Sequence, residues 1–98
     1  MFSVDEIQTI DQQYFNVKNA GCYQITLQSK NTRHIWNIHS QVLTLESGRS
    51  LVVYHKHKAN QPYHIQKWFH PVTLADAQKL IKSHDEWYLE NKRCCRHK

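Results

Sequence analysis

Residues 22–39 read CYQITLQSKNTRHIWNIH, and this stretch decides the fold because large apolar and polar residues alternate along it. The alternating apolar positions are Tyr23, Ile25, Leu27, Trp36 and Ile38. A polar connection at residues 29–32 separates them into two strands, and an even-length connection pairs Ile25 with Trp36. The large apolar side chains then share one face, apart from Ile35. The pattern therefore predicts a β-hairpin with one face buried and the other in water.

The two ends of the chain carry helix signals. Ser3 and Glu6 form a capping box, which predicts a helix over residues 4–13. Thr73 is a favourable N-cap for a second helix that we expect to end near Asn91. The apolar stripe of this second helix consists of Leu74, Ala77, Leu80, Ile81, His84, Trp87 and Tyr88. Helical spacing of these residues predicts that the helix packs on the buried face of the sheet.

Between the hairpin and the second helix the sequence predicts two further strands. The broken alternation after Ile38 predicts a bulge or bend at residues 39–41. A turn is expected at residues 46–49, followed by a strand over residues 51–54. A final strand is expected over residues 62–69, at an edge of the sheet because it opens with a proline.

These elements predict an α+β fold with the order α-β-β-β-β-α, in which an antiparallel four-stranded meander has its helices packed on one face. We expect one domain over residues 1–92 and a basic, flexible C-terminal tail over residues 93–98. The order resembles that of a double-stranded-RNA-binding domain. That family places a lysine cluster at the start of its last helix, where this chain has Thr73-Leu74-Ala75-Asp76. The resemblance is one of architecture alone, and it assigns no family.

The composition indicates the cellular location of the protein and the kind of partner it favours. Its 98 residues carry a formal net charge of +5, which favours polyanions as partners. No apolar run reaches the roughly 18 residues of a membrane span, and the N-terminus lacks the pattern of a signal peptide. Three cysteines, two of them adjacent, do not make a disulfide framework. We therefore expect a cytoplasmic protein without a membrane partner.

Several kinds of active site are excluded by what the sequence lacks. Two glycines cannot form a glycine-rich phosphate loop. Between Asp11 and Asp76 the only carboxylate is that of Glu46, so the predicted sheet has no pair of acids for glycoside hydrolysis or for binding Mg²⁺. The same stretch is rich in lysine and histidine. It predicts a basic, histidine-rich sheet flanked by more acidic helices.

The positive signals gather in the last predicted hairpin. Its candidate nucleic-acid-binding residues are Arg49, His55, Lys56, His57, Lys58, His64, Lys67 and Trp68. A four-residue loop would place His55 opposite His64, with His57 on their face. Three interpretations follow: a merely solvated hairpin, contact with a nucleic-acid backbone, or a metal site formed by these three histidines. The metal interpretation has the least support, because no carboxylate lies near enough in sequence to orient the imidazoles.

We therefore expect a small binding domain that contacts RNA or DNA through its basic sheet, with no cofactor, no metal and no catalytic residues. The first alternative is a metal-independent ribonuclease, in which His55, His57 or His64 would transfer protons while Lys56, Lys67 or Arg49 stabilised the transition state. The second is a protein-interaction domain that binds another protein or a second copy of itself.

Overall fold

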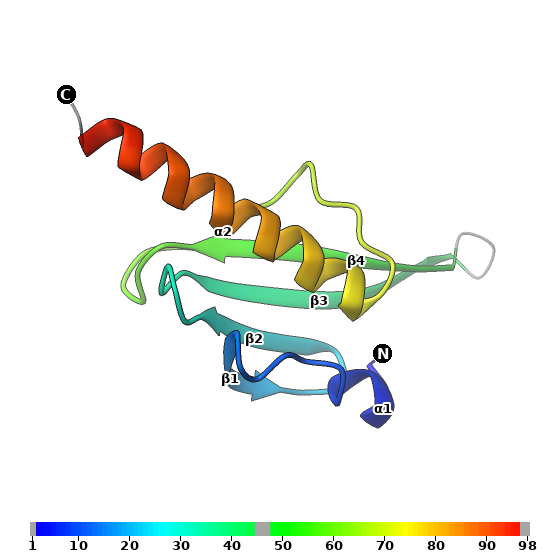
Figure 1. Ribbon diagram of the computed structural model, residues 1–98. Coiled ribbons are helices and arrows are strands. Elements are labelled where there is room, and N and C mark those ends of the chain that lie inside the picture. Colours follow the sequence, from blue (N-terminus) through cyan, green and yellow to red (C-terminus); the bar gives the residue numbers. More distant parts are fainter. Residues whose placement is uncertain (1, 45–47, 97–98) are drawn as a thin grey trace.

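The computed structural model confirms the α+β class and shows an antiparallel meander with helices on one face (Figure 1). It describes the backbone of residues 2–44 and 48–96, and the side chains of residues 2–40 and 51–91. The elements are α1 (Val4–Ile7), β1 (Phe15–Ala20), β2 (Gln24–Ser29), β3 (Ile35–Thr44), β4 (Gly48–Lys56), β5 (His64–Ile65) and α2 (Leu74–Arg96). The strands are ordered β1-β2-β3-β4-β5 across one sheet, so β1 adds a fifth strand to the four that were predicted.

The hairpin of β2 and β3 has the predicted faces but a different register. Ile25 pairs with Ile38, and Leu27 pairs with Trp36, which is a shift of two residues from the predicted pairing. Because side chains alternate with a period of two, an even shift leaves every residue on its predicted face. All four of these side chains are buried. Tyr23 was expected among them but lies just before β2 and is 67 % exposed.

The register shift has its cause in the connection between the two strands. Arg33 adopts a left-handed backbone conformation with φ of 67°, which is a turn conformation and not a strand conformation. The side chain of Asn31 accepts a hydrogen bond of 2.7 Å from the backbone N–H of Thr32. The hydroxyl of Thr32 accepts a hydrogen bond of 3.2 Å from the backbone N–H of His34. These local bonds keep residues 30–33 in the turn, so β3 starts later than the polar pattern predicted.

The core lies between α2 and one face of the sheet, as Figure 1 shows. Trp36 is its largest fully buried side chain, and its indole N–H donates a hydrogen bond of 3.1 Å to the hydroxyl of buried Ser29. The partner for the indole matters, because a buried polar group without one costs roughly 1–3 kcal/mol. The apolar members of the core are Phe2, Ile10, Phe15, Ile25, Leu27, Trp36, Ile38, Leu51, Val53, Leu74, Ala77 and Ile81.

The N-terminal segment departs from prediction, because α1 ends at Ile7 instead of continuing to residue 13. The Ser3 cap is present, with its hydroxyl accepting from the N–H of Glu6 at 3.1 Å. Beyond Ile7, polar side chains take over the backbone: the hydroxyl of Thr9 donates to the carbonyl of Glu6, and a carboxylate oxygen of Asp11 accepts from the N–H of Gln13. Such local bonds compete with helix formation.

Strand β1 was missed because its alternation is interrupted. The pairing with β2 shifts between Val17 and Asn19, which leaves Lys18 as an extra residue in the strand. The period-two signal by which a strand is recognised is lost at that point.

Helix α2 begins as predicted, with the Thr73 hydroxyl accepting from the N–H of Asp76 at 3.1 Å. It extends to Arg96, beyond the predicted end near Asn91, while the division into a domain and a tail at residue 92 stays a prediction. Trp87 was assigned to the buried stripe, but it is 59 % exposed, whereas its neighbours Asp85 and Tyr88 contact the β2–β3 turn. Among the described residues, no helix is long and apolar enough to cross a membrane.

The later strands also differ in their ends. The irregularity in β3 falls between Val42 and Thr44, not at residues 39–41. Gly48 and Arg49 belong to β4, whereas a turn was predicted there; the rest of that turn lies outside the described residues. The last strand is reduced to the two residues of β5, after which Gln66 still donates its backbone N–H to the carbonyl of Val53 at 2.8 Å.

Candidate functional site

The residues predicted to contact nucleic acid are divided between the two faces of the sheet. His55 pairs with His64, as predicted from a four-residue loop. His55 faces α2 and is only 4 % exposed, so the face that it shares with His57 is covered by the helix at this point. Lys56 lies between them on the strand and therefore points to the opposite face.

The remaining predicted residues lie on or beside the long connection from β4 to α2. Lys58, His64 and Lys67 are exposed, and Trp68 is 89 % exposed. The four-residue loop spans residues 58–61 and is closed by a hydrogen bond of 3.1 Å from the N–H of Gln61 to the carbonyl of Lys58. The side chain of Arg49 lies outside the described part of the chain.

The face of the sheet turned away from α2 forms the first candidate site. We call it the open face and define it by Gln24, Thr26, Asn37, His39, Tyr54 and Lys56. Asn37 lies at its centre: its amide donates to the hydroxyl of Thr26 at 2.8 Å and to the side-chain oxygen of Gln24 at 3.4 Å. The oxygen of the same amide contacts Nε2 of His39. This network holds the polar side chains of β2 and β3 in fixed positions.

Aromatic rings surround a shallow hollow on the open face. The hollow has a volume of about 270 Å³ and is lined by Asn37, His39, Tyr54 and Tyr63. The rings of His39 and Tyr54 meet edge to face, with centroids 5.0 Å apart. The ammonium group of Lys56 lies 4.2 Å from the centroid of the Tyr63 ring, a cation–π contact. Partial burial raises the pKa of the Tyr63 hydroxyl, so this hydroxyl stays neutral.

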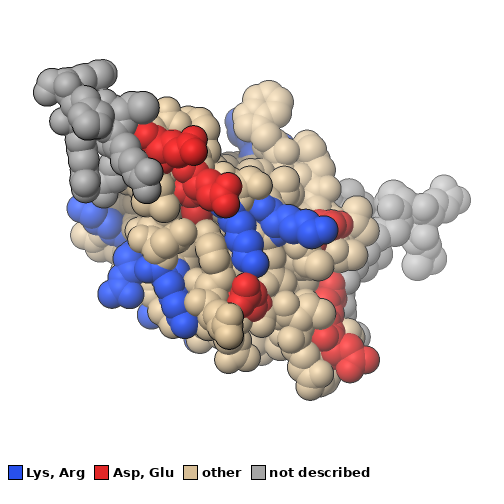
Figure 2. Space-filling view, in the orientation of Figure 1, with Lys and Arg blue, Asp and Glu red and all other residues tan. Residues whose placement is uncertain are grey.

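The acidic residues with described side chains lie outside the sheet, whereas lysine and histidine occur in its strands. None of the five strands contains an Asp or Glu. The acids with described side chains belong to α1, to α2, or to Asp11, which forms an ion pair of 3.0 Å with Lys82 of α2. Figure 2 shows the side that carries α2, where basic and acidic side chains are interspersed. The open face carries Lys56 and His39, and none of the residues that define it is acidic.

A second cluster lies where the β2–β3 connection and the end of β4 meet α2. It consists of His34, His55 and His57, which we call the histidine trio. One ring nitrogen from each lies within 4.8 Å of the other two. His34 and His57 each lie one residue beyond the Ile35–Lys56 pair, so they are cross-strand neighbours, and their rings stack in parallel at 4.1 Å. His55 is two residues from His57 on the same strand and therefore on the same face.

Hydrogen bonds fix the tautomer of His55. The side-chain amide nitrogen of Gln66, which can only donate, lies 3.2 Å from Nδ1 of His55. Nδ1 must therefore accept, and the proton of the neutral ring lies on Nε2. Nε2 is 2.9 Å from Nδ1 of His34 and donates to it.

Burial against the core disfavours the charged forms of His55 and His84. Desolvation, with further contributions from His34 and other nearby histidines, lowers the pKa of His55 from 6.5 to about 3. The ring stacks on the Trp36 indole at 3.9 Å. Desolvation also lowers the pKa of His84, which α2 places 5.0 Å from His55. Nδ1 of His84 is buried and has no hydrogen-bond partner among the described residues.

The position of His34 is fixed through a buried carboxylate. The hydroxyl of Thr32, which accepts from the backbone N–H of His34, donates in turn to a carboxylate oxygen of Asp85 at 3.2 Å. The Tyr88 ring, one turn further along α2, lies edge-on to His34 at 4.4 Å and to His57 at 5.4 Å. The trio is therefore held by the turn, the strand and the helix together.

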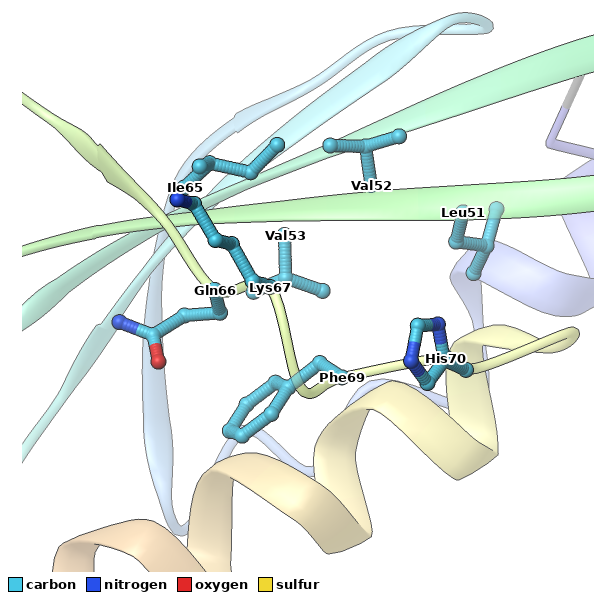
Figure 3. A pocket seen from close by; sticks show the side chains of 8 residues that line it. All are labelled: Leu51, Val52, Val53, Ile65, Gln66, Lys67, Phe69 and His70. Atoms are coloured by element: carbon cyan, nitrogen blue, oxygen red, sulfur yellow. The ribbon is translucent and has the colours of Figure 1, made fainter.

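A further hollow, of about 160 Å³, lies beside β4 and beneath residues 65–70. Figure 3 shows that Phe69 is directed toward α2, whereas Lys67 extends away from the helix. Half of the lining residues are aliphatic, and the charged group of Lys67 points outward, so this hollow lacks the convergent polar groups of a specific ligand site.

Sequence reasoning identified the histidines of β4 but missed their neighbours. His34 was absent from the candidate set, although its position one residue before β3 would have placed it opposite His57 in the correct register. Tyr54 and Tyr63, which line the hollow of the open face, were also absent from the candidate set. Comparison of the chain with protein-family models, with curated proteins and with solved structures finds no match.

Proposed function

We propose that this domain binds single-stranded nucleic acid through the open face of its sheet. The observation that carries the proposal is the combination, on one face without acidic residues, of a lysine with aromatic rings around a shallow hollow. Proteins that bind single strands use such surfaces: basic groups follow the phosphates, while bases stack on exposed rings.

Tyr63 and Tyr54 are the proposed stacking residues. Both tyrosines line the hollow: Tyr63 has 37 % of its surface in water, and Tyr54 contacts the ring of His39. Lys56 supports Tyr63 from one side and carries the positive charge closest to the hollow. Asn37, whose amide is engaged with Thr26, Gln24 and His39, holds the side chains around the hollow in place.

The predicted basic residues outside the sheet have a supporting role in this proposal. Lys58 and Lys67 are exposed on the connection that follows β4, where they would extend the phosphate contact, and Trp68 offers a further ring. His55 is left out because it is buried against α2. We also infer a cytosolic location, which the exposed thiol of Cys22 supports, since reduced cysteines are the rule in that compartment.

Fluorescence anisotropy with labelled single-stranded RNA and DNA, at about 50 mM salt, tests the proposal. Replacing Tyr63 with Ala should weaken binding by about 1–3 kcal/mol, the usual value of one stacked base. Tyr63→Leu keeps an apolar side chain but not the ring, and it should lose most of the same affinity. Duplexes of the same sequences should bind more weakly, because their bases are not free to stack.

Lysine variants provide a matched control. Lys56→Ala should flatten the slope of log affinity against log salt by about 0.7, the value for one phosphate contact on a single strand. Lys79→Ala removes an exposed lysine from α2, on the other side of the molecule, and should leave the slope unchanged. Absence of binding at tens of micromolar protein, or equal effects of the two lysines, would overturn the proposal. A larger species in light scattering, with no nucleic-acid binding, would favour the protein-interaction alternative.

A further inference from the structure

We propose that the histidine trio is a binding site for one Zn²⁺ ion, with His34, His55 and His57 as ligands. The site lies on the helix-covered side of the sheet and is independent of the open face. Three imidazole nitrogens leave a fourth position for water, which is the ligand pattern of an open zinc site.

The spacing of the three rings supports this assignment. Zn–N bonds of 2.0–2.1 Å in a tetrahedral arrangement place the ligating nitrogens roughly 3.3 Å apart and the ring centroids about 5 Å apart. Nε2 of His55 is 2.9 Å from Nδ1 of His34, and the His55 ring lies 4.8 Å from His34 and 5.0 Å from His57. These two ring separations match those of a tetrahedral site, but the Nδ1 lone pair of His34, which accepts from His55, has to turn toward the shared metal.

The third pair requires a larger adjustment. The stacked rings of His34 and His57 are 4.1 Å apart and nearly parallel, so one ring must move away by about 1 Å and tilt until both in-plane lone pairs point at the same metal. His57 is the exposed member of the trio and can make this movement, whereas His34 and His55 are buried and fixed. Zn²⁺ would therefore enter from the solvent side, next to His57 and Tyr88.

Gln66 is suited to orient His55 in both forms of the site. Without metal its amide nitrogen donates to Nδ1 of His55. Binding of Zn²⁺ at Nε2 moves the ring proton to Nδ1, which then needs an acceptor. Rotation of the Gln66 amide by half a turn presents its oxygen to that proton, so the proton changes position within the ring and none is released. Ligating histidines generally donate their other N–H in this way.

The sequence contains a competing set of metal ligands in Cys94, Cys95 and His97, and the test must separate the two. The full-length chain with Cys94→Ser, Cys95→Ser and His97→Asn serves as the reference. We measure its affinity for ZnCl₂ by competition with a chromophoric chelator. One Zn²⁺ per chain should bind, and His57→Asn in this reference should weaken binding by more than about a hundredfold, because even the partners of zinc ligands contribute about ten- to a hundredfold.

Two further variants define the site. His64→Asn removes an exposed histidine that pairs with His55 across the sheet but lies outside the trio, and it should leave the affinity unchanged. Gln66→Leu should weaken binding about tenfold. Since His57 and His64 are exposed, both asparagine variants should remain folded, and thermal melting without zinc checks this.

Nuclear magnetic resonance of the ring nitrogens gives an independent reading. Addition of ZnCl₂ should shift the nitrogen signals of the trio and leave those of His39 and His70 in place. The proposal is overturned if the reference chain binds no Zn²⁺ at about 100 μM, if His57→Asn binds as tightly as the reference, or if zinc binding is lost with the tail substitutions. None of these results bears on nucleic-acid binding by the open face.

Discussion

The hydroxyl of Tyr14 donates a hydrogen bond of 2.7 Å to Oδ2 of Asp85, which connects the segment before β1 to the middle of α2. Asp85 is fully buried, and its other carboxylate oxygen accepts from Thr32 in the β2–β3 turn. One carboxylate thus joins three segments that are distant in the sequence. Desolvation and the bond to Asp85 both raise the pKa of Tyr14, so its hydroxyl keeps the proton that it donates.

Replacing Tyr14 with Phe should therefore lower the free energy of unfolding by about 1.5–3 kcal/mol, the usual contribution of a hydrogen bond to a charged group. The matched control is Tyr23→Phe, which removes the hydroxyl of an exposed tyrosine and should change stability by less than about 0.5 kcal/mol. Urea denaturation measures both. Equal effects would mean that the carboxylate of Asp85 finds another donor when Tyr14 cannot provide one.

The faces of the β2–β3 hairpin give a second prediction. Leu27→Ala should cost about 2–5 kcal/mol, because it truncates a fully buried side chain. Gln24→Ala, at an exposed position of the same strand, should cost within about 0.5 kcal/mol. Denaturant unfolding that ranks the two substitutions equally would contradict the face assignment.

Asn37 requires a separate prediction, because the sequence pattern treats it as an ordinary surface residue. It is only 8 % exposed, and its amide donates to Thr26 and Gln24. Asn37→Ala should cost about 1–3 kcal/mol, since it removes these bonds from a nearly buried position. Thr26→Val leaves the amide of Asn37 with the weaker Gln24 contact alone, and it should reproduce part of that loss in the same denaturation assay. A cost for Asn37→Ala below about 0.5 kcal/mol, the usual range of a surface substitution, would show that the network contributes nothing to stability.

The face of each strand in the central hairpin could be predicted from sequence because period two is a strong signal there. The register could not, since it depends on the turn conformation of Arg33 and on the hydrogen bonds of Asn31 and Thr32. Strand β1 was missed for a related reason: the bulge at Lys18 removes the periodicity by which a strand is recognised.

The candidate site was only partly accessible to sequence reasoning. The pairing of His55 with His64 followed from loop length and is confirmed. That His34 joins His55 and His57, while His64 remains exposed, depends on the pairing of β3 with β4, in which Ile35 lies opposite Lys56, and on the path of α2. Neither can be deduced from the local pattern. The site prediction itself stays a prediction, and the proposed contact now rests on the open face.

Helix α2 offers a further test of packing. Ile81 is fully buried, so Ile81→Ala should cost about 2–5 kcal/mol. Trp87→Ala should cost far less than the usual 3–5 kcal/mol for a buried tryptophan, because more than half of its surface is already in water. Thermal unfolding of the two variants distinguishes this arrangement from the predicted stripe, in which both residues were buried.

The buried histidines predict a specific dependence of stability on pH. In the folded protein, burial lowers the pKa of His55 to about 3, while the unfolded chain titrates near 6.5. Below pH 6.5 the unfolded state therefore binds more protons than the folded state, and the free energy of unfolding should fall as the pH decreases. The slope should approach about 1.4 kcal/mol per pH unit for each such histidine, and His84, whose pKa is also lowered, adds to it. Urea unfolding with a chelator present, between about pH 7.5 and 4.5, measures the slope of the metal-free protein.

The control variant His55→Phe keeps a ring beside Trp36 but cannot be protonated. Its stability at pH 7.5 reports the lost hydrogen bonds, and its decline toward pH 4.5 should be shallower than that of the natural chain. Parallel declines in the two proteins would show that His55 becomes protonated without unfolding, and the tautomer assigned from Gln66 would then apply only at high pH.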